Sequence, residues 1–231
     1  MKTAVITGAS RGIGLEHTRC YAERGVRVFA TVRSLADAVE LHTIAARSNG
    51  AVNVVEYDAA LPDGHRSLKD AVGDTPVDLL LANAGIMGDR AQMFGSIDTE
   101  EMLELYRVNS VAPLRLAQAL AGNVANSTRK LIAFQSSQMG SIGDNKSGGY
   151  YAYRASKAAL NMIAKGVAND LKSRGIIAVT LHPGWVKTRM GGSSAPLSVA
   201  QSVAGQQRLF DKLTLADTGR FFNFDGKELP W

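Results

Sequence analysis

The sequence has a single cysteine and only four histidines. Cys20 has no partner for an internal disulfide, which suits a reducing, cytoplasmic compartment. The histidines show no metal-ligand spacing with one another or with Cys20. We therefore expect neither a structural disulfide nor a bound metal ion.

Long uncharged runs are also missing. No stretch approaches the roughly 18 apolar residues of a membrane span, and the apolar run at the amino terminus is too short for a signal peptide. The formal charge is +5, but the 26 Lys and Arg are dispersed and the longest basic run is Arg129–Lys130. Such a dispersed surplus favours attraction of a small anion over nucleic acid. We expect neither a membrane nor a nucleic-acid partner.

The apolar residues that are present, 45% of 231, suffice for one large α/β domain over residues 1–231 without a linker or an internal repeat. Short apolar, β-branched runs alternate with amphipathic stretches. They predict strands over residues 2–7, 26–32, 51–57, 77–82, 131–134, 176–181 and 220–224. Helices are predicted from about residue 12, over 35–47, after residue 58, and over 98–125, 150–172 and 199–213.

A glycine-rich turn joins the first strand to the first helix. Gly8, Gly12 and Gly14 follow the spacing Gly-x-x-x-Gly-x-Gly, with Ser10, Arg11 and Ile13 between them. Glycine allows a tight turn and lets a pyrophosphate approach the free amide groups of the helix N-terminus. The alternative is a turn without a ligand, but the position between a strand and a helix favours dinucleotide binding.

Arginine stands where the second strand ends. In a doubly wound sheet an acidic residue at this place would hold a ribose 2′-hydroxyl, and an arginine would hold a 2′-phosphate. Here the strand ends in Arg33, and Arg11 of the glycine turn can approach the same phosphate. The pair predicts NADP(H) in preference to NAD(H). Asp58, after the third strand, suits either an adenine contact or a helix cap or turn.

Polar residues follow the later strands. Asn83, Ala84 and Gly85 come at the carboxyl edge of the sheet, where ligands bind in such folds. Asn109 lies near the middle of the predicted 98–125 helix, either partnered in the interior or exposed. Ser137 is followed three residues later by Gly140, so the chain can bend there and aim a hydroxyl into a cleft.

Tyr153 and Lys157 lie four residues apart in a predicted helix, and are therefore neighbours on its surface. We expect the ammonium of Lys157 to favour the ionised form of Tyr153, whose free phenol is a poor acid or base near neutrality. Alone, Tyr-x-x-x-Lys is a weak signal that also occurs in ordinary amphipathic helices.

The segment after the sixth strand is predicted to form a substrate lid over residues 184–218. Pro183 and Gly184 stop the strand, and the residues that follow are rich in Gly and Ser. Candidates for an apolar substrate pocket are Met87, Met139, Ile142, Trp185 and Met190, although Met and Trp more often simply pack.

With these motifs assembled, the sequence resembles the short-chain dehydrogenase/reductase family along essentially its whole length. The resemblance rests on residues 7–14, Asn-Ala-Gly at 83–85, Asn109, Ser137, Tyr153-x-x-x-Lys157 and Pro183-Gly184, which occur in the family's order. Residues 150–161 and the final 224–231 resemble more narrowly the branch that contains C-factor and the sniffer carbonyl reductase.

The resemblance implies a Rossmann-type, doubly wound parallel sheet of seven strands with helices on both faces, and a homodimer or homotetramer. It implies that Tyr153 is the general acid in reduction and the base in oxidation, and that Lys157 lowers the pKa of Tyr153 and binds the nicotinamide ribose. Ser137 would bind the substrate oxygen, and Asn109 would anchor a water in a proton relay. Cofactor contacts are implied for Gly8, Ser10, Arg11, Gly12, Ile13, Gly14, Arg33, Asp58, Asn83, Ala84, Gly85, Tyr153, Lys157, Pro183, Gly184, Val186 and Thr188.

Ser137 and Tyr153 are 16 residues apart, a wider gap than the family commonly has, which leaves Ser136 as an alternative to Ser137. The function implied is NADPH-dependent reduction of a ketone or aldehyde to an alcohol, reversibly. The alternative is an NADP(H)-binding sensor or signalling protein of C-factor type with little turnover.

Overall fold

The protein contains one sheet of seven parallel strands. The computed structural model describes residues 1–89 and 92–231. The strands pair in the order β3-β2-β1-β4-β5-β6-β7, which confirms the doubly wound fold expected from the sequence. They span β1 (Thr3–Ile6), β2 (Arg27–Val32), β3 (Val52–Glu56), β4 (Leu79–Ala82), β5 (Leu131–Gln135), β6 (Ile177–His182) and β7 (Phe221–Asn223).

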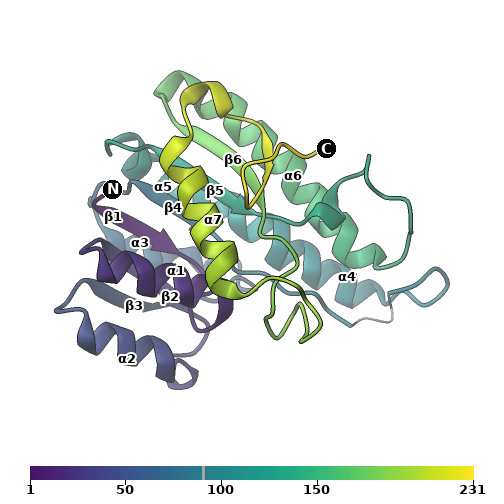
Figure 1. Ribbon diagram of the computed structural model, residues 1–231, viewed down its shortest axis with the longest axis horizontal. Helices are drawn as coiled ribbons and strands as arrows, with labels where there is room; N and C mark the ends of the chain where they lie inside the picture. Colours follow the sequence, from purple (N-terminus) through teal and green to yellow (C-terminus); the bar gives the residue numbers. More distant parts are fainter. Residues whose placement is uncertain (90–91) are drawn as a thin grey trace.

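Helices cover both faces of this sheet (Figure 1). They are α1 (Gly12–Glu23), α2 (Val39–Arg47), α3 (His65–Val72), α4 (Thr99–Tyr106), α5 (Ala112–Ala125), α6 (Tyr151–Leu171) and α7 (Val199–Lys212). Short turns of helix lie at Leu35–Asp37, Arg107–Val111, Gln138–Gly140, Lys172–Arg174 and Leu215–Asp217.

Successive side chains along each strand point to opposite faces of the sheet, which divides the core into two layers. In β1, Ala4 and Ile6 face one way, into a cluster completed by α1, α2 and α7, whereas Val5 faces α3, α5 and α6. Strands buried on both faces in this way are continuous apolar runs, which is why the sequence reveals them so clearly. The α4 helix packs against α6 instead of against the sheet.

The helix predicted over 98–125 is interrupted. Its two α-helical parts, α4 and α5, are joined by a wide π turn over Arg107–Val111. Pro113 explains the break, because proline has no amide to donate to the carbonyl of Asn109 four residues earlier. Asn109 therefore lies in the irregular turn, where it is fully buried.

Neither a membrane-crossing helix nor a metal cluster is present in the described ranges 1–89 and 92–231. No helix there is both long and apolar enough to cross a bilayer. His, Cys, Asp and Glu side chains do not gather there into a group that could hold a metal ion.

Candidate active site

The glycine turn lies at the carboxyl edge of the sheet, between β1 and α1. Gly8 and Gly12 have φ values of +66° and +55°, which favour glycine. A Cβ on Gly14 would lie 2.4 Å from the carbonyl oxygen of Gly8, so a side chain there would force the turn open. Ser10 and Ile13 are half-buried in the same turn.

Asn83 ties this turn to the end of β4. Its Nδ2 donates to the carbonyl oxygens of Thr7 (2.8 Å) and Gly8 (3.2 Å). The Thr7 hydroxyl in return accepts from the amides of Asn83 and Ala84, both at 3.0 Å. The exits of β1 and β4 are thus one hydrogen-bonded unit, with Ala84 packed on Gly8.

Arg11 and Arg33 lie on adjacent loops at this edge. Arg11 precedes α1 and Arg33 follows β2, and both side chains are exposed. The two loops are joined because the amides of Gly8 and Ala9 donate to the hydroxyl and the carbonyl of Thr31. Asp58 makes a local turn, since its Oδ1 accepts from the amide of Ala60 at 2.8 Å. The structural alternative considered for Asp58 is therefore present.

Tyr153, Ser137 and Lys157 converge in a buried cluster. These three residues are only 5%, 8% and 4% exposed, respectively. The Ser137 hydroxyl acts on the Tyr153 phenol as a partner that favours its ionised form, and the Nζ atom of Lys157 lies 5.9 Å from the centre of the Tyr153 ring. Lys157 Nζ donates to the carbonyl of Gln135 at 2.9 Å. A phenol, a hydroxyl and an amine thus share one site at the ends of β5 and α6.

Burial has the largest influence on the pKa values of Tyr153 and Lys157. It raises the pKa of Tyr153 to about 12, although the hydrogen bond with Ser137 opposes the rise. It also lowers the pKa of Lys157 to about 8. The sequence led us to expect a more acidic Tyr153 beside an ammonium. In the structure the loss of water around the phenol outweighs the amine, which is bonded to Gln135.

The hydroxyls of Ser136 and Ser137 have different partners. Ser136 Oγ donates to Asn161 Oδ1 at 2.6 Å, inside the packing of α6 against β5. Ser137 Oγ accepts from the amide of Met139 at 3.1 Å and meets Tyr153. Of the two serines, Ser137 is the one whose hydroxyl lies with the phenol.

Asn109 holds the chain that leaves β4. Its Oδ1 accepts from the amide of Ile86 (2.9 Å), and its Nδ2 donates to the Ile86 carbonyl (2.8 Å) and to Ser156 Oγ (3.0 Å). A Cβ on Gly85 would lie 3.1 Å from Asn109 Oδ1 and 3.4 Å from Lys157 Nζ. Gly85 therefore brings Asn109 and Lys157 next to the same stretch of backbone.

The segment after β6 returns to the glycine turn. A Cβ on Gly12 would lie 3.3 Å from the methyl group of Thr188. The Pro183 carbonyl accepts from Ser202 of α7, Gly184 has a φ of +82°, and Val186 is buried beside Leu197. The start of the predicted lid is thus anchored at the same edge of the sheet.

A comparison with known proteins agrees with this arrangement. A sequence profile of the short chain dehydrogenase family matches residues 2–196. The chain belongs to the short-chain dehydrogenase family.

The relatives confirm the narrower resemblance as well. C-signal of Myxococcus xanthus is 42% identical over 156 residues, which are 68% of this chain and 93% of that protein. The carbonyl reductase Sniffer of D. melanogaster has a TM-score of 0.93 and 34% identity, with both chains covered in full. A carbonyl reductase of Pseudomonas aeruginosa PAO1 in complex with NADP has a TM-score of 0.89 and 37% identity, again over both full chains. This member of the short-chain dehydrogenase family is thus an oxidoreductase whose structural neighbours include carbonyl reductases.

The five apolar residues predicted to form a pocket in this short-chain dehydrogenase differ in burial. Met87 and Met139 pack against the cluster around Tyr153. Ile142 and Trp185 are 79% and 55% exposed, and Met190 is at the surface too. Composition alone could not separate the packed methionines from the exposed side chains.

Two residues that contact this cluster were not predicted for it. Ser156 Oγ donates to the carbonyl of Tyr153 at 2.8 Å, and Gln92 Oε1 accepts from the amide of Tyr153 at 2.8 Å. Ser156 stands between Tyr153 and Lys157 in the sequence, so helical spacing could have suggested it. No local pattern marks Gln92, which belongs to a loop 61 residues earlier.

Proposed function

We propose that this protein is an NADPH-dependent carbonyl reductase that reduces a ketone or aldehyde to an alcohol, reversibly, with Tyr153 as the general acid. The observation that carries the proposal is the burial of Tyr153 together with Ser137 beside Lys157, whose Nζ lies near Gly85 at the carboxyl edge of the sheet. The NADP-bound carbonyl reductase of similar fold supports the choice of chemistry.

The carboxyl edge of the sheet fits a dinucleotide phosphate. The amides of Gly12, Ile13 and Gly14 open α1 and donate to no acceptor in the described part of the chain. The guanidinium groups of Arg11 and Arg33 have no hydrogen-bond or ion-pair partner among residues 1–89 and 92–231, so both cations are available to a 2′-phosphate. NADPH, when bound, supplies the hydride.

The glycine turn, Asn83–Gly85 and the 183–188 segment would hold the nucleotide. The residues predicted to do so are Gly8, Ser10, Arg11, Gly12, Ile13, Gly14, Arg33, Asp58, Asn83, Ala84, Gly85, Tyr153, Lys157, Pro183, Gly184, Val186 and Thr188. The contact between Thr188 and Gly12 supports a lid that begins at this edge, whereas α7, which lies within the predicted range 184–218, packs into the core.

Ser137 and Tyr153 would bind the carbonyl oxygen of the substrate. Their hydroxyls donate hydrogen bonds that strengthen as negative charge develops on that oxygen, which stabilises the transition state more than the ground state. Burial keeps the phenol protonated at neutral pH, the form that reduction requires. The alkoxide is a much stronger base than a phenolate, so the proton passes from Tyr153 to it.

Lys157 would then stabilise the phenolate left on Tyr153. Its ammonium is held by the Gln135 carbonyl and carries its charge below a pKa of about 8. Asn109 fixes the backbone of Ile86, and in the predicted relay its amide would also hold a water on the path to Lys157. In the reverse direction Tyr153 accepts the proton from the alcohol.

The similarity to C-signal favours a second candidate, an NADP(H)-binding sensor or signalling protein with little turnover. A panel of aliphatic and aromatic aldehydes and ketones, followed by NADPH absorbance, separates the two candidates. We expect turnover with at least one carbonyl, and higher catalytic efficiency with NADPH than with NADH. NADPH binding without turnover of any carbonyl would favour the sensor.

Self-association through the helices within residues 98–125 (α4 and α5) and 150–172 (α6) is proposed as well. Leu103 of α4 and Met162 of α6 are 50% and 74% exposed, an apolar surface that pairing of two chains would cover. Light scattering after size exclusion should give a dimer or tetramer, and a monomer would contradict this.

A further inference from the structure

Gln92 is a buried amide that joins two segments near Tyr153. The residue is 2% exposed. Its Nε2 donates to the carbonyl of Met87 at 2.7 Å and to that of Asp89. Its Oε1 accepts from the amide of Tyr153 at 2.8 Å, and its own carbonyl accepts from the amide of Tyr151 at 3.2 Å.

These bonds supply what the start of α6 lacks. The first amides of any helix have no acceptor within the helix, and a side chain of the N-cap residue usually provides one. At α6 the N-cap is Tyr150, which has a φ of +49° and makes no side-chain cap bond. Gln92 takes over this role from a separate loop, and it caps the amide of Tyr153 itself.

The carbonyl group of Tyr153 is held through Ser156 and Asn109. The Tyr153 carbonyl accepts from Ser156 Oγ, which in turn accepts from Asn109 Nδ2. Asn109 also clamps both backbone groups of Ile86. Both polar groups of the Tyr153 main chain are therefore tied, through one amide side chain each, to the segment that leaves β4.

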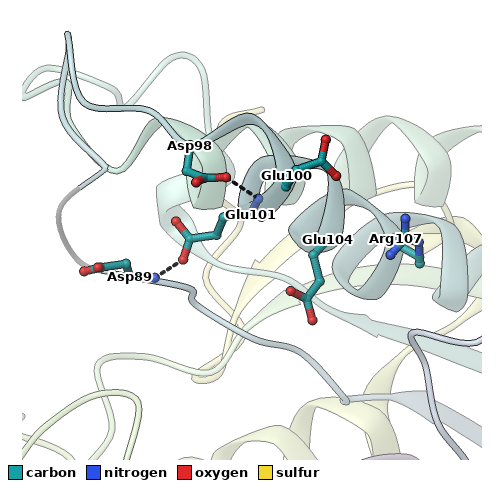
Figure 2. Close-up of a pocket in the computed structure, with 6 residues that line it drawn as sticks. All are labelled: Asp89, Asp98, Glu100, Glu101, Glu104 and Arg107. Atoms are coloured by element: carbon teal, nitrogen blue, oxygen red, sulfur yellow. Dashed lines mark hydrogen bonds between the residues drawn. The ribbon is translucent and has the colours of Figure 1, made fainter.

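That segment is itself fixed by α4. Figure 2 shows the carboxylate of Glu101 directed at the amide of Asp89, while Asp98 caps the start of the helix. A Cβ on Gly88, whose φ is +71°, would lie within 3.0 Å of Glu101 Oε1, a Leu105 methyl group and Gln92 Nε2. Gln92 and the α4 side chains of Glu101 and Leu105 thus pack tightly around Gly88.

We propose that Gln92 is a positioning residue for Tyr153. Gln92 lies in the segment that follows β4 and caps the Tyr153 amide from there. It thereby fixes the position of the phenol relative to Ser137 and Lys157. It touches none of the reacting atoms. The inference rests on the proposed reductase function, because it assigns Gln92 a part in that reaction.

Asn123 offers a matched control for loss of a buried amide. It is 4% exposed, and its Nδ2 donates to two loop carbonyls, those of Gly73 (2.7 Å) and Thr75 (2.9 Å). It lies at the opposite, amino end of β4, where its own carbonyl accepts from the amide of Val77. Removing either amide takes a side-chain donor away from two backbone carbonyls, so both changes should lower the melting temperature.

The experiment compares Gln92→Met, Gln92→Glu and Asn123→Leu with the wild type. For each, kcat and KM are measured with a carbonyl from the panel, and the Kd of NADPH is measured by fluorescence. Gln92→Met should lower kcat by about tenfold or more, since small displacements of a reacting group are costly, with Kd within about twofold of the wild type. Gln92→Glu keeps an acceptor for the Tyr153 amide and should lose less kcat. Asn123→Leu should keep kcat within about twofold, because its bonds lie far from the reacting groups.

The outcomes separate this inference from the proposed function. Wild-type kcat in Gln92→Met, or equal losses of kcat in Gln92→Met and Asn123→Leu, overturns the positioning role alone. A loss in Gln92→Glu as large as in Gln92→Met overturns the capping of Tyr153. If the wild type turns over no carbonyl at all, the reductase function fails and the role of Gln92 fails with it.

Discussion

The buried amine of Lys157 should make the stability of the protein depend on pH in a specific way. Burial lowers its pKa from 10.5 to about 8, so the folded protein holds the proton less tightly than the unfolded chain does. Converted through linkage, this shift costs the folded state about 3 kcal/mol at pH 7, where both states are protonated.

The cost disappears as the pH rises. Between about pH 8 and pH 10.5 the unfolded chain binds more protons than the folded one, so the free energy of unfolding increases with pH over this window. At pH 10 about 1 kcal/mol of the cost remains. Relative to a Lys157→Met variant, which has a stem of similar length and no charge, the wild type should gain about 2 kcal/mol from pH 7 to pH 10.

Urea unfolding of both proteins without nucleotide, followed by circular dichroism at pH 7 and pH 10, measures this gain. The variant also deprives the Gln135 carbonyl of its donor. That loss is the same at both pH values and cancels in the comparison. A stability difference that stays constant between the two pH values, or changes in the opposite direction, would refute the assigned burial of the amine.

Three further substitutions test the roles of individual side chains. Ser137→Ala should lower kcat by about a hundredfold, whereas Ser136→Ala should chiefly lower stability, because its hydroxyl bonds Asn161; the reverse pattern in steady-state kinetics would reassign the catalytic serine. Arg33→Ala should raise the KM for NADPH by about tenfold to a hundredfold and leave that for NADH almost unchanged, as expected for loss of one charged hydrogen bond. An equal effect on both cofactors would refute recognition of the 2′-phosphate.

Most of the fold is predictable from the sequence because the central strands are buried on both faces. A run such as Leu79–Ala82 then has no polar residue to obscure the strand. The exception is the helix predicted over 98–125. Its apolar pattern continues through Pro113, yet the missing amide of that proline opens a π turn around Asn109. Pro113 is visible in the sequence, but the apolar periodicity around it favoured the prediction of one continuous helix.

Whether a site residue could be predicted also depends on whether its contacts are local or distant in the sequence. The glycine turn and the Tyr153–Lys157 pair are fixed by backbone geometry within a few residues, so their spacing identifies them. The contribution of Gln92 depends on how the β4 exit meets α6, which no spacing encodes. The acidity of Tyr153 is also a property of the folded interior, because it depends on how much water is removed.

The central claim is tested most directly by Tyr153→Phe. Turnover of a carbonyl substrate and the Kd of NADPH are measured on the same preparation. The account predicts that kcat falls by roughly 10²–10⁴-fold while NADPH still binds with the wild-type Kd. Turnover that survives the loss of the phenol hydroxyl would contradict it.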